Sequence, residues 1–76
     1  MLGALFTEEE ICEIEYLVKK ELEELSFEID DSRINHMVRR AMEERYQILF
    51  KIFKRFASSE DCIKFMRQPS QKNINE

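Results

Sequence analysis

The segment from Arg33 to Ala57 constrains the fold most, because as a helix it is apolar around about half of its circumference. At 100° per residue, its apolar side chains fill a continuous arc of roughly 180°. A helix that packs on one neighbour needs an apolar stripe of only about 100°. The segment must therefore be covered on two sides, yet the chain offers only one other long helix. This predicts a protein that associates with itself or with another molecule. The arc contains Met37, Ile48, Ala41, Ile34, Ile52, Val38, Phe56, Leu49, Met42, Phe53 and Tyr46, and Phe50 lies about 40° beyond Tyr46.

The chain is expected to be all-α. Its one glycine, Gly3, and its one proline, Pro69, both lie near the ends, so no helix breaker interrupts the interior. A chain of 76 residues has room for a single domain, and a domain of this size is marginally stable unless it is stapled or oligomeric. We expect one helical domain over residues 1–68, with helices at about 8–26, 31–57 and 60–67. The polar residues 69–76 are expected to form a disordered tail.

Local signals place the start of the first helix. Thr7 can accept a hydrogen bond as the N-cap, and Glu10 stands three residues later, as a capping box requires. The apolar positions that follow recur with helical spacing. They are Ile11, Ile14, Val18, Leu22 and Leu25.

Asp30, Asp31 or Ser32 can cap the second helix. We favour Asp30, because Ile29 and Ile34 then form a hydrophobic staple. A connection of about five residues makes the two helices antiparallel neighbours in a long hairpin. The second helix would then extend beyond the first by about six residues, or about 9 Å. The short third helix is expected to cover Phe53 and Phe56 in that overhang.

We expect two hairpins to build a two-fold dimer, a four-helix bundle. The interface should use the side of the second helix that the first helix leaves uncovered. The preferred interface consists of Met42, Tyr46, Leu49, Phe50 and Phe53, with Arg45 in the same region. The pattern does not fix which flank faces the first helix, and the alternative interface consists of Met37, Ala41 and Ile48.

Arg45 is unusual, because it lies near the middle of the apolar arc. A buried guanidinium must be paired. In a hairpin that turns near Ile29, Glu15 lies at the depth of Arg45 and is the expected partner. Glu21 falls about seven residues out of register with Arg45 within the hairpin, and a second subunit could bring the two together. A hot spot for a protein partner is the alternative reading of Arg45.

Charge is distributed unevenly along the chain. Residues 1–31 hold eleven acidic residues against two lysines, a net of −9, and residues 32–76 hold ten basic residues against five acidic ones, a net of +5. Packing of oppositely charged helices explains this split, and a nucleic-acid surface on the second helix is the alternative. The pI of about 5.1 argues against strong binding of nucleic acid. The contacts in that alternative would be Arg39, Arg40, Lys51, Lys54 and Arg55.

The sequence lacks the signatures of enzymes, cofactor sites and metal sites. The only histidine, His36, has no ligand-type residues at metal-binding spacing, and Cys12 and Cys62 form no C-x-x-C pair. We expect two free thiols, as in a cytoplasmic protein. No apolar run approaches the roughly 20 residues of a membrane span. We therefore expect no catalytic site, no cofactor and no metal.

The sequence therefore favours a small cytoplasmic regulatory or adaptor protein that acts by protein–protein interaction as a homodimer. This hypothesis rests on the excess apolar surface of the second helix. A nucleic-acid-binding regulator that uses the basic face of that helix is the alternative.

Overall fold

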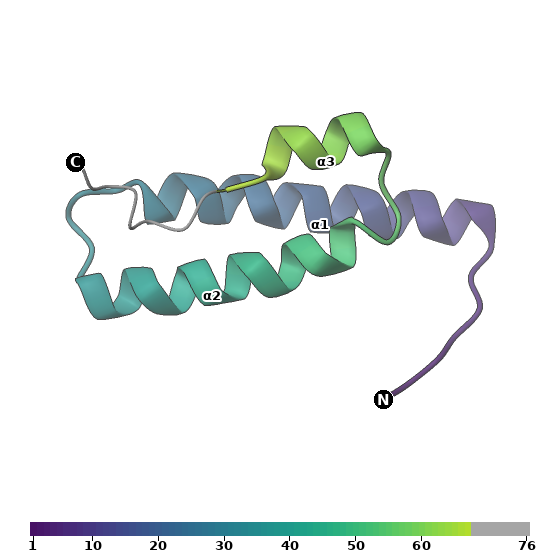
Figure 1. The fold of residues 1–76 in the computed structure, drawn as a ribbon, viewed down its shortest axis with the longest axis horizontal. Helices are drawn as coiled ribbons and strands as arrows, with labels where there is room; N and C mark the ends of the chain where they lie inside the picture. The colour runs from purple at the N-terminus through teal and green to yellow at the C-terminus, as the bar shows by residue number, and fades with distance from the viewer. Residues whose placement is uncertain (68–76) are drawn as a thin grey trace.

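The computed structural model describes residues 1–67 and is all-helical over that range, as predicted (Figure 1). Helix α1 spans Glu8–Ile29, α2 spans His36–Phe53 and α3 spans Ser59–Phe65. Figure 1 shows α1 and α2 as an antiparallel hairpin, with the short α3 lying back along it. The prediction of a disordered tail over residues 69–76 lies outside the described residues.

Helix α1 begins as predicted, with both hydrogen bonds of the capping box. The Thr7 hydroxyl accepts from the Glu10 backbone N–H at 3.1 Å, and the Glu10 carboxylate accepts from the Thr7 N–H at 2.9 Å. Glu8 and Glu9 join Glu10 in the first turn, where the helix dipole favours negative charge. These local interactions fix the start of the helix independently of tertiary packing.

The boundary between α1 and α2 differs from the prediction. Helix α1 continues to Ile29, and α2 begins only at His36 rather than near residue 31. The N-cap of α2 is Asn35, whose side-chain oxygen accepts from the Met37 backbone N–H at 2.7 Å. The predicted cap at Asp30 is wrong, because Asp30 ends α1 instead of starting α2.

A short turn between the helices explains this shift. The Asp31 carboxylate accepts hydrogen bonds from the backbone N–H of Arg33 at 2.9 Å and from its guanidinium at 3.1 Å. These bonds hold the turn and lower the pKa of the Asp31 carboxyl below its usual value. A side chain that bonds its own backbone two residues onward is typical of a turn and competes with helix formation.

Helix α2 ends at Phe53 rather than at Ala57, so α1 with 22 residues is longer than α2 with 18. After Phe53 the backbone tightens, and Arg55 and Phe56 each donate to the carbonyl three residues earlier at 3.0 Å. Ser58 then caps α3 by accepting from the Asp61 N–H at 3.2 Å. The predicted overhang of the second helix is therefore wrong.

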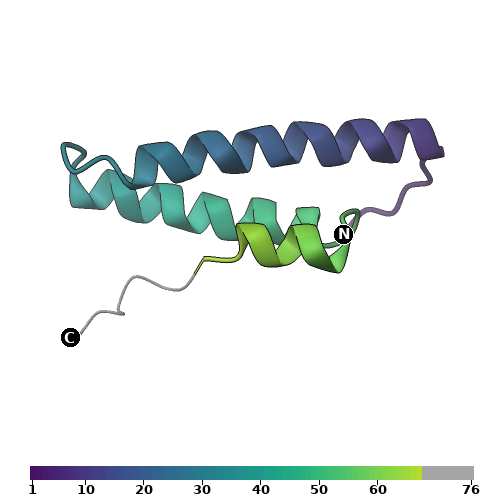
Figure 2. The ribbon, with the colours of Figure 1, turned by 90° about the horizontal axis from the view of Figure 1, so that it is seen from above.

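The core lies where the hairpin meets α3 (Figure 2). The Phe53 ring packs edge-to-face on Phe65 of α3 with ring centroids 5.4 Å apart, so α3 covers Phe53 as predicted. Phe56 packs instead on Phe6, with ring centroids 6.1 Å apart. The fully enclosed core consists of Leu22, Leu25, Ile29, Tyr46, Phe50 and Phe53.

Candidate interaction surface

The residues of the preferred dimer interface lie mostly inside the protein's own core. Tyr46 is 2%, Phe50 7% and Phe53 0% exposed, and Met42 and Leu49 are half-buried against them. This flank of α2 is unavailable to a partner because α1 and α3 already cover it. The correction has a simple cause: a third helix of only seven residues covers aromatic side chains that the sequence assigned to a second subunit.

The other flank of α2 is uncovered, and so is Leu17 on α1. Leu17 is 58%, Met37 71%, Val38 47% and Ile48 61% exposed, and Ala41 is also exposed. We call these five residues the open face. It includes the whole alternative interface, Met37, Ala41 and Ile48. Figures 1 and 2 show α3 along one side of the hairpin only, and the helical positions of these residues place them away from it.

An ion pair joins the two helices at the open face. The Arg45 guanidinium donates to the Glu21 carboxylate at 3.0 Å, with the two side chains 58% and 36% exposed. The predicted pairing with Glu15 is wrong, because the turn lies later in the chain than a cap at Asp30 implied. Centring the turn near Arg33 brings Arg45 level with Glu21 within one hairpin.

The basic residues do not form one surface. Arg39 is half-buried and donates to two backbone carbonyl oxygens, that of Ile29 at 2.9 Å and that of Asp31 at 2.7 Å. The Ile29 carbonyl lies at the end of α1, where intrahelical partners are missing, and the Asp31 carbonyl lies in the turn that follows. Arg39 therefore closes the hairpin turn instead of facing a ligand.

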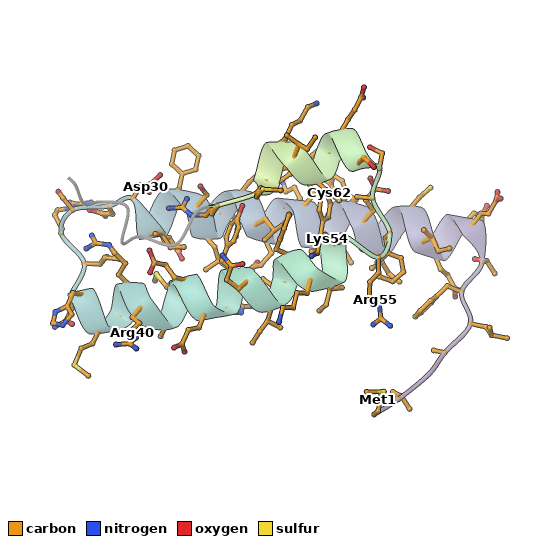
Figure 3. All side chains as sticks on the ribbon, viewed as in Figure 1. Met1, Asp30, Arg40, Lys54, Arg55 and Cys62 are labelled. Atoms are coloured by element: carbon orange, nitrogen blue, oxygen red, sulfur yellow. The ribbon has the colours of Figure 1, made fainter. Side chains whose placement is uncertain are left out.

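The other four bases of the nucleic-acid alternative are exposed. Arg40 makes a loose ion pair with Glu44 at 4.0 Å. Figure 3 shows Arg40 on the side of α2 turned away from α3, and Arg55 at the connection that follows α2. Lys51 and Lys54 are exposed nearby in sequence. What remains is a short basic edge near the end of α2.

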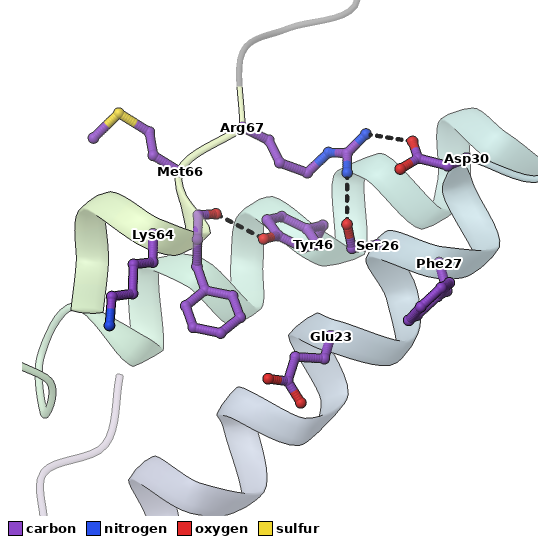
Figure 4. Close-up of a pocket in the computed structure, with 9 residues that line it drawn as sticks. Glu23, Ser26, Phe27, Asp30, Tyr46, Lys64, Met66 and Arg67 are labelled. Carbon is purple, nitrogen blue, oxygen red and sulfur yellow. Dashed lines mark hydrogen bonds and ion pairs between the residues drawn. The ribbon is translucent and has the colours of Figure 1, made fainter. Parts of the chain in front are cut away.

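A groove of about 720 Å³ lies between α1 and α3 (Figure 4). The Tyr46 hydroxyl donates to the Phe65 carbonyl at 2.6 Å across it. Burial raises the pKa of the Tyr46 phenol above its usual value, and the nearby Arg67 guanidinium opposes that rise. The lining residues are Glu23, Ser26, Phe27, Asp30, Tyr46, Lys64, Phe65, Met66 and Arg67.

Arg67 connects the end of α3 to α1 across this groove. Its guanidinium donates to the Ser26 hydroxyl at 2.9 Å and to the Asp30 carboxylate at 3.2 Å, and it lies 5.5 Å from the centre of the Tyr46 ring. These polar groups bind one another, so the groove holds α3 against α1 rather than presenting groups that converge on a ligand. Sequence reasoning missed Arg67, because it follows the last helix and belongs to no periodic pattern.

Elsewhere in residues 1–67, Cys12 and Cys62 are free thiols. Over the same range no group of three or more His, Cys, Asp or Glu residues is placed to hold a metal ion. Among residues 1–67, no helix combines the length and the apolar character that crossing a bilayer requires.

Comparison of the chain with protein family models, with curated proteins and with solved structures finds no match.

Proposed function

We propose that this chain is a small cytoplasmic regulatory or adaptor protein that acts by binding another protein chain through its open face. The observation that carries the proposal is the exposure of Leu17, Met37 and Ile48 at 58%, 71% and 61% on one side of the hairpin. Complete burial of a side chain of this kind contributes about 1.5–3 kcal/mol, so a partner that covers them would gain substantially. Two free thiols suit a reducing compartment.

The shape of the open face favours a protein ligand over a small molecule. It is the outer side of two packed helices, and the groove at Tyr46 and Arg67 lies on the other side of the hairpin. A helical partner can bind such a surface by packing its side chains into the grooves between side chains of the two helices. This mode of binding needs no enclosed cavity. Arg45 adds a charged group within the apolar surface, which is a common feature of protein-binding hot spots.

A pair of matched variants tests this proposal. Ile48 on the open face and Ile63 on α3 are 61% and 68% exposed, so glutamate at either position should leave the fold intact. Tagged Ile48→Glu should lose the proteins that the wild type captures from native cytosol, while Ile63→Glu should keep them. Equal capture by the two variants would contradict a role for the open face.

The proposal also predicts weak binding to polyanions. Arg39 is held in the turn and Arg40 pairs with Glu44, so Lys51, Lys54 and Arg55 are too few to offset the net charge of −4. We expect no retention on heparin at physiological salt. Strong retention that falls steeply as salt is raised would favour the nucleic-acid alternative instead.

A further inference from the structure

The charges around the open face are arranged in two opposite edges. The α1 side is acidic, with exposed Glu13, Glu24 and Glu28 at helical positions around Leu17. Over Glu8–Ile29, nine glutamates and two lysines give a net of −7. Over His36–Phe53, four basic and two acidic residues give a net of +2. A partner that fits this face must therefore place positive charge over α1 and negative charge over α2.

A second copy of this chain meets that requirement. We propose that two copies pack open face to open face about a two-fold axis parallel to the hairpin, so that α1 of each lies against α2 of the other. This inference rests on the proposed use of the open face and names its occupant. The resulting four-helix bundle has every helix antiparallel to its neighbours and both hairpin turns at the same end.

The charges favour a two-fold axis parallel to the hairpin over one perpendicular to it. An axis perpendicular to the hairpin would place α1 against α1 and set two strongly acidic helices side by side. The parallel axis places each acidic α1 against a basic α2 instead. Like charges held close together in an interface disfavour an arrangement, so the parallel axis is the complementary one.

The Arg45–Glu21 pair lies where the two copies meet. Arg45 and Glu21 are at the same depth in the hairpin, so a parallel axis brings Arg45 of each chain toward the partner's Glu21. The four charges then alternate in sign around the centre of the bundle. Arg45 makes a single hydrogen bond in the described part of the chain, to Glu21, and its guanidinium has further N–H groups to donate.

The two helices that carry the open face are long enough for a specific interface. Each partner in a standard interface buries about 800 Å², roughly an eighth of the 6258 Å² surface of this chain. Helix α2, with 18 residues, offers a contact about 27 Å long. Two helices side by side supply the width.

Sedimentation velocity over a wide range of concentrations tests whether the occupant is a second copy. The wild type should form a dimer, Ile48→Glu should weaken it by more than about tenfold, and Ile63→Glu should leave it unchanged. Circular dichroism confirms that each variant is helical. A wild type that stays monomeric at the highest concentration, or an Ile63→Glu variant as weak as Ile48→Glu, overturns the proposal.

Charge reversal gives a second test that does not depend on Ile48. Arg45→Glu and Glu21→Arg should each weaken self-association, because each places like charges together at the centre of the bundle. An equimolar mixture of the two variants should associate again as a heterodimer. Failure of the mixture to recover, with both chains folded, argues against these contacts.

Cross-linking tests the axis itself. In a Cys12→Ser, Cys62→Ser background, chains that carry Leu17→Cys should form disulfides with chains that carry Ile48→Cys, because these positions lie at similar depth on facing helices. Neither variant alone should cross-link. Cross-linking of Leu17→Cys chains with one another overturns the parallel axis.

The two proposals fail in distinguishable ways. If the wild type is monomeric but captures another protein, and Ile48→Glu abolishes that capture, the proposed function is supported and the dimer is contradicted. If the wild type is monomeric and Ile48→Glu captures as much protein as the wild type, both proposals are contradicted.

Discussion

The two flanks of α2 both carry apolar side chains, but one flank is buried and the other is exposed. On the flank toward α3, Phe53 and Tyr46 are enclosed, and the polar groups of Tyr46 and Arg67 have partners within the chain. On the open face, Ile48 and its neighbours are exposed around a single ion pair. What distinguishes the two flanks is α3, a seven-residue helix that packs Phe65 on Phe53 and accepts the Tyr46 hydrogen bond on one side only.

The largest expected effect follows from the enclosed flank. Phe53→Ala should cost about 3–5 kcal/mol in the free energy of unfolding, because it removes a fully buried ring that packs on Phe65. Ile48→Ala should change stability by less than about 0.5 kcal/mol at concentrations where the chain is monomeric. Urea denaturation followed by circular dichroism measures both. Similar losses for the two variants would show that the flanks are not used differently.

Much of the fold could be predicted from local sequence. The capping box at Thr7 and Glu10 and the periodicity of the apolar residues act over three or four positions, so the sequence shows them directly. The all-helical hairpin followed from these signals. The cover of Phe53 by α3 was predicted from an overhang of the second helix, and the structure has the cover without that overhang. The error at the turn was also local: Asp30 and Asn35 are both good caps, and the Asp31–Arg33 contact decides between them.

The site could be predicted less well, because its features depend on contacts distant in sequence. Moving the cap from Asp30 to Asn35 shifts the hairpin register, and the partner of Arg45 changes from Glu15 to Glu21. The choice of flank depends on Arg67 reaching α1 from 41 residues away. A helical wheel shows that α2 has two apolar flanks, but it does not show which of them α3 covers.

A smaller effect is expected from the hydrogen bond that holds α3. Tyr46→Phe keeps the buried ring and removes the donor to the Phe65 carbonyl, so it should cost about 1 kcal/mol. Tyr16→Phe is the matched control, because Tyr16 is 53% exposed and should change little. Thermal and urea unfolding measure both. No loss for Tyr46→Phe would show that packing of Phe65 alone secures the enclosed flank.

The same hydroxyl should make the enclosed flank sensitive to alkali. The pKa of Tyr46 is raised in the folded chain, so its contribution to stability is complete below the unfolded value of about 10. That contribution is lost as the pH rises through the folded value. Tyr46→Phe should therefore flatten the decline of stability above about pH 10, and Tyr16→Phe should not. Identical alkaline profiles for the two variants would contradict this assignment.

The smallest effect should come from the ion pair on the open face. Arg45 and Glu21 are 58% and 36% exposed, and exposed pairs of this kind contribute about 0.2–1 kcal/mol. A double-mutant cycle with Arg45→Ala and Glu21→Ala, measured in dilute monomer, should give a coupling energy in that range. In the proposed dimer, Arg45 and Glu21 of both copies form a cluster of four charges. The interface also shields all four side chains from water. The coupling energy should therefore increase with protein concentration. A coupling that is large in dilute monomer would mean that Arg45 belongs to the fold of one chain, and the contrast between the flanks would then be smaller than the exposures suggest.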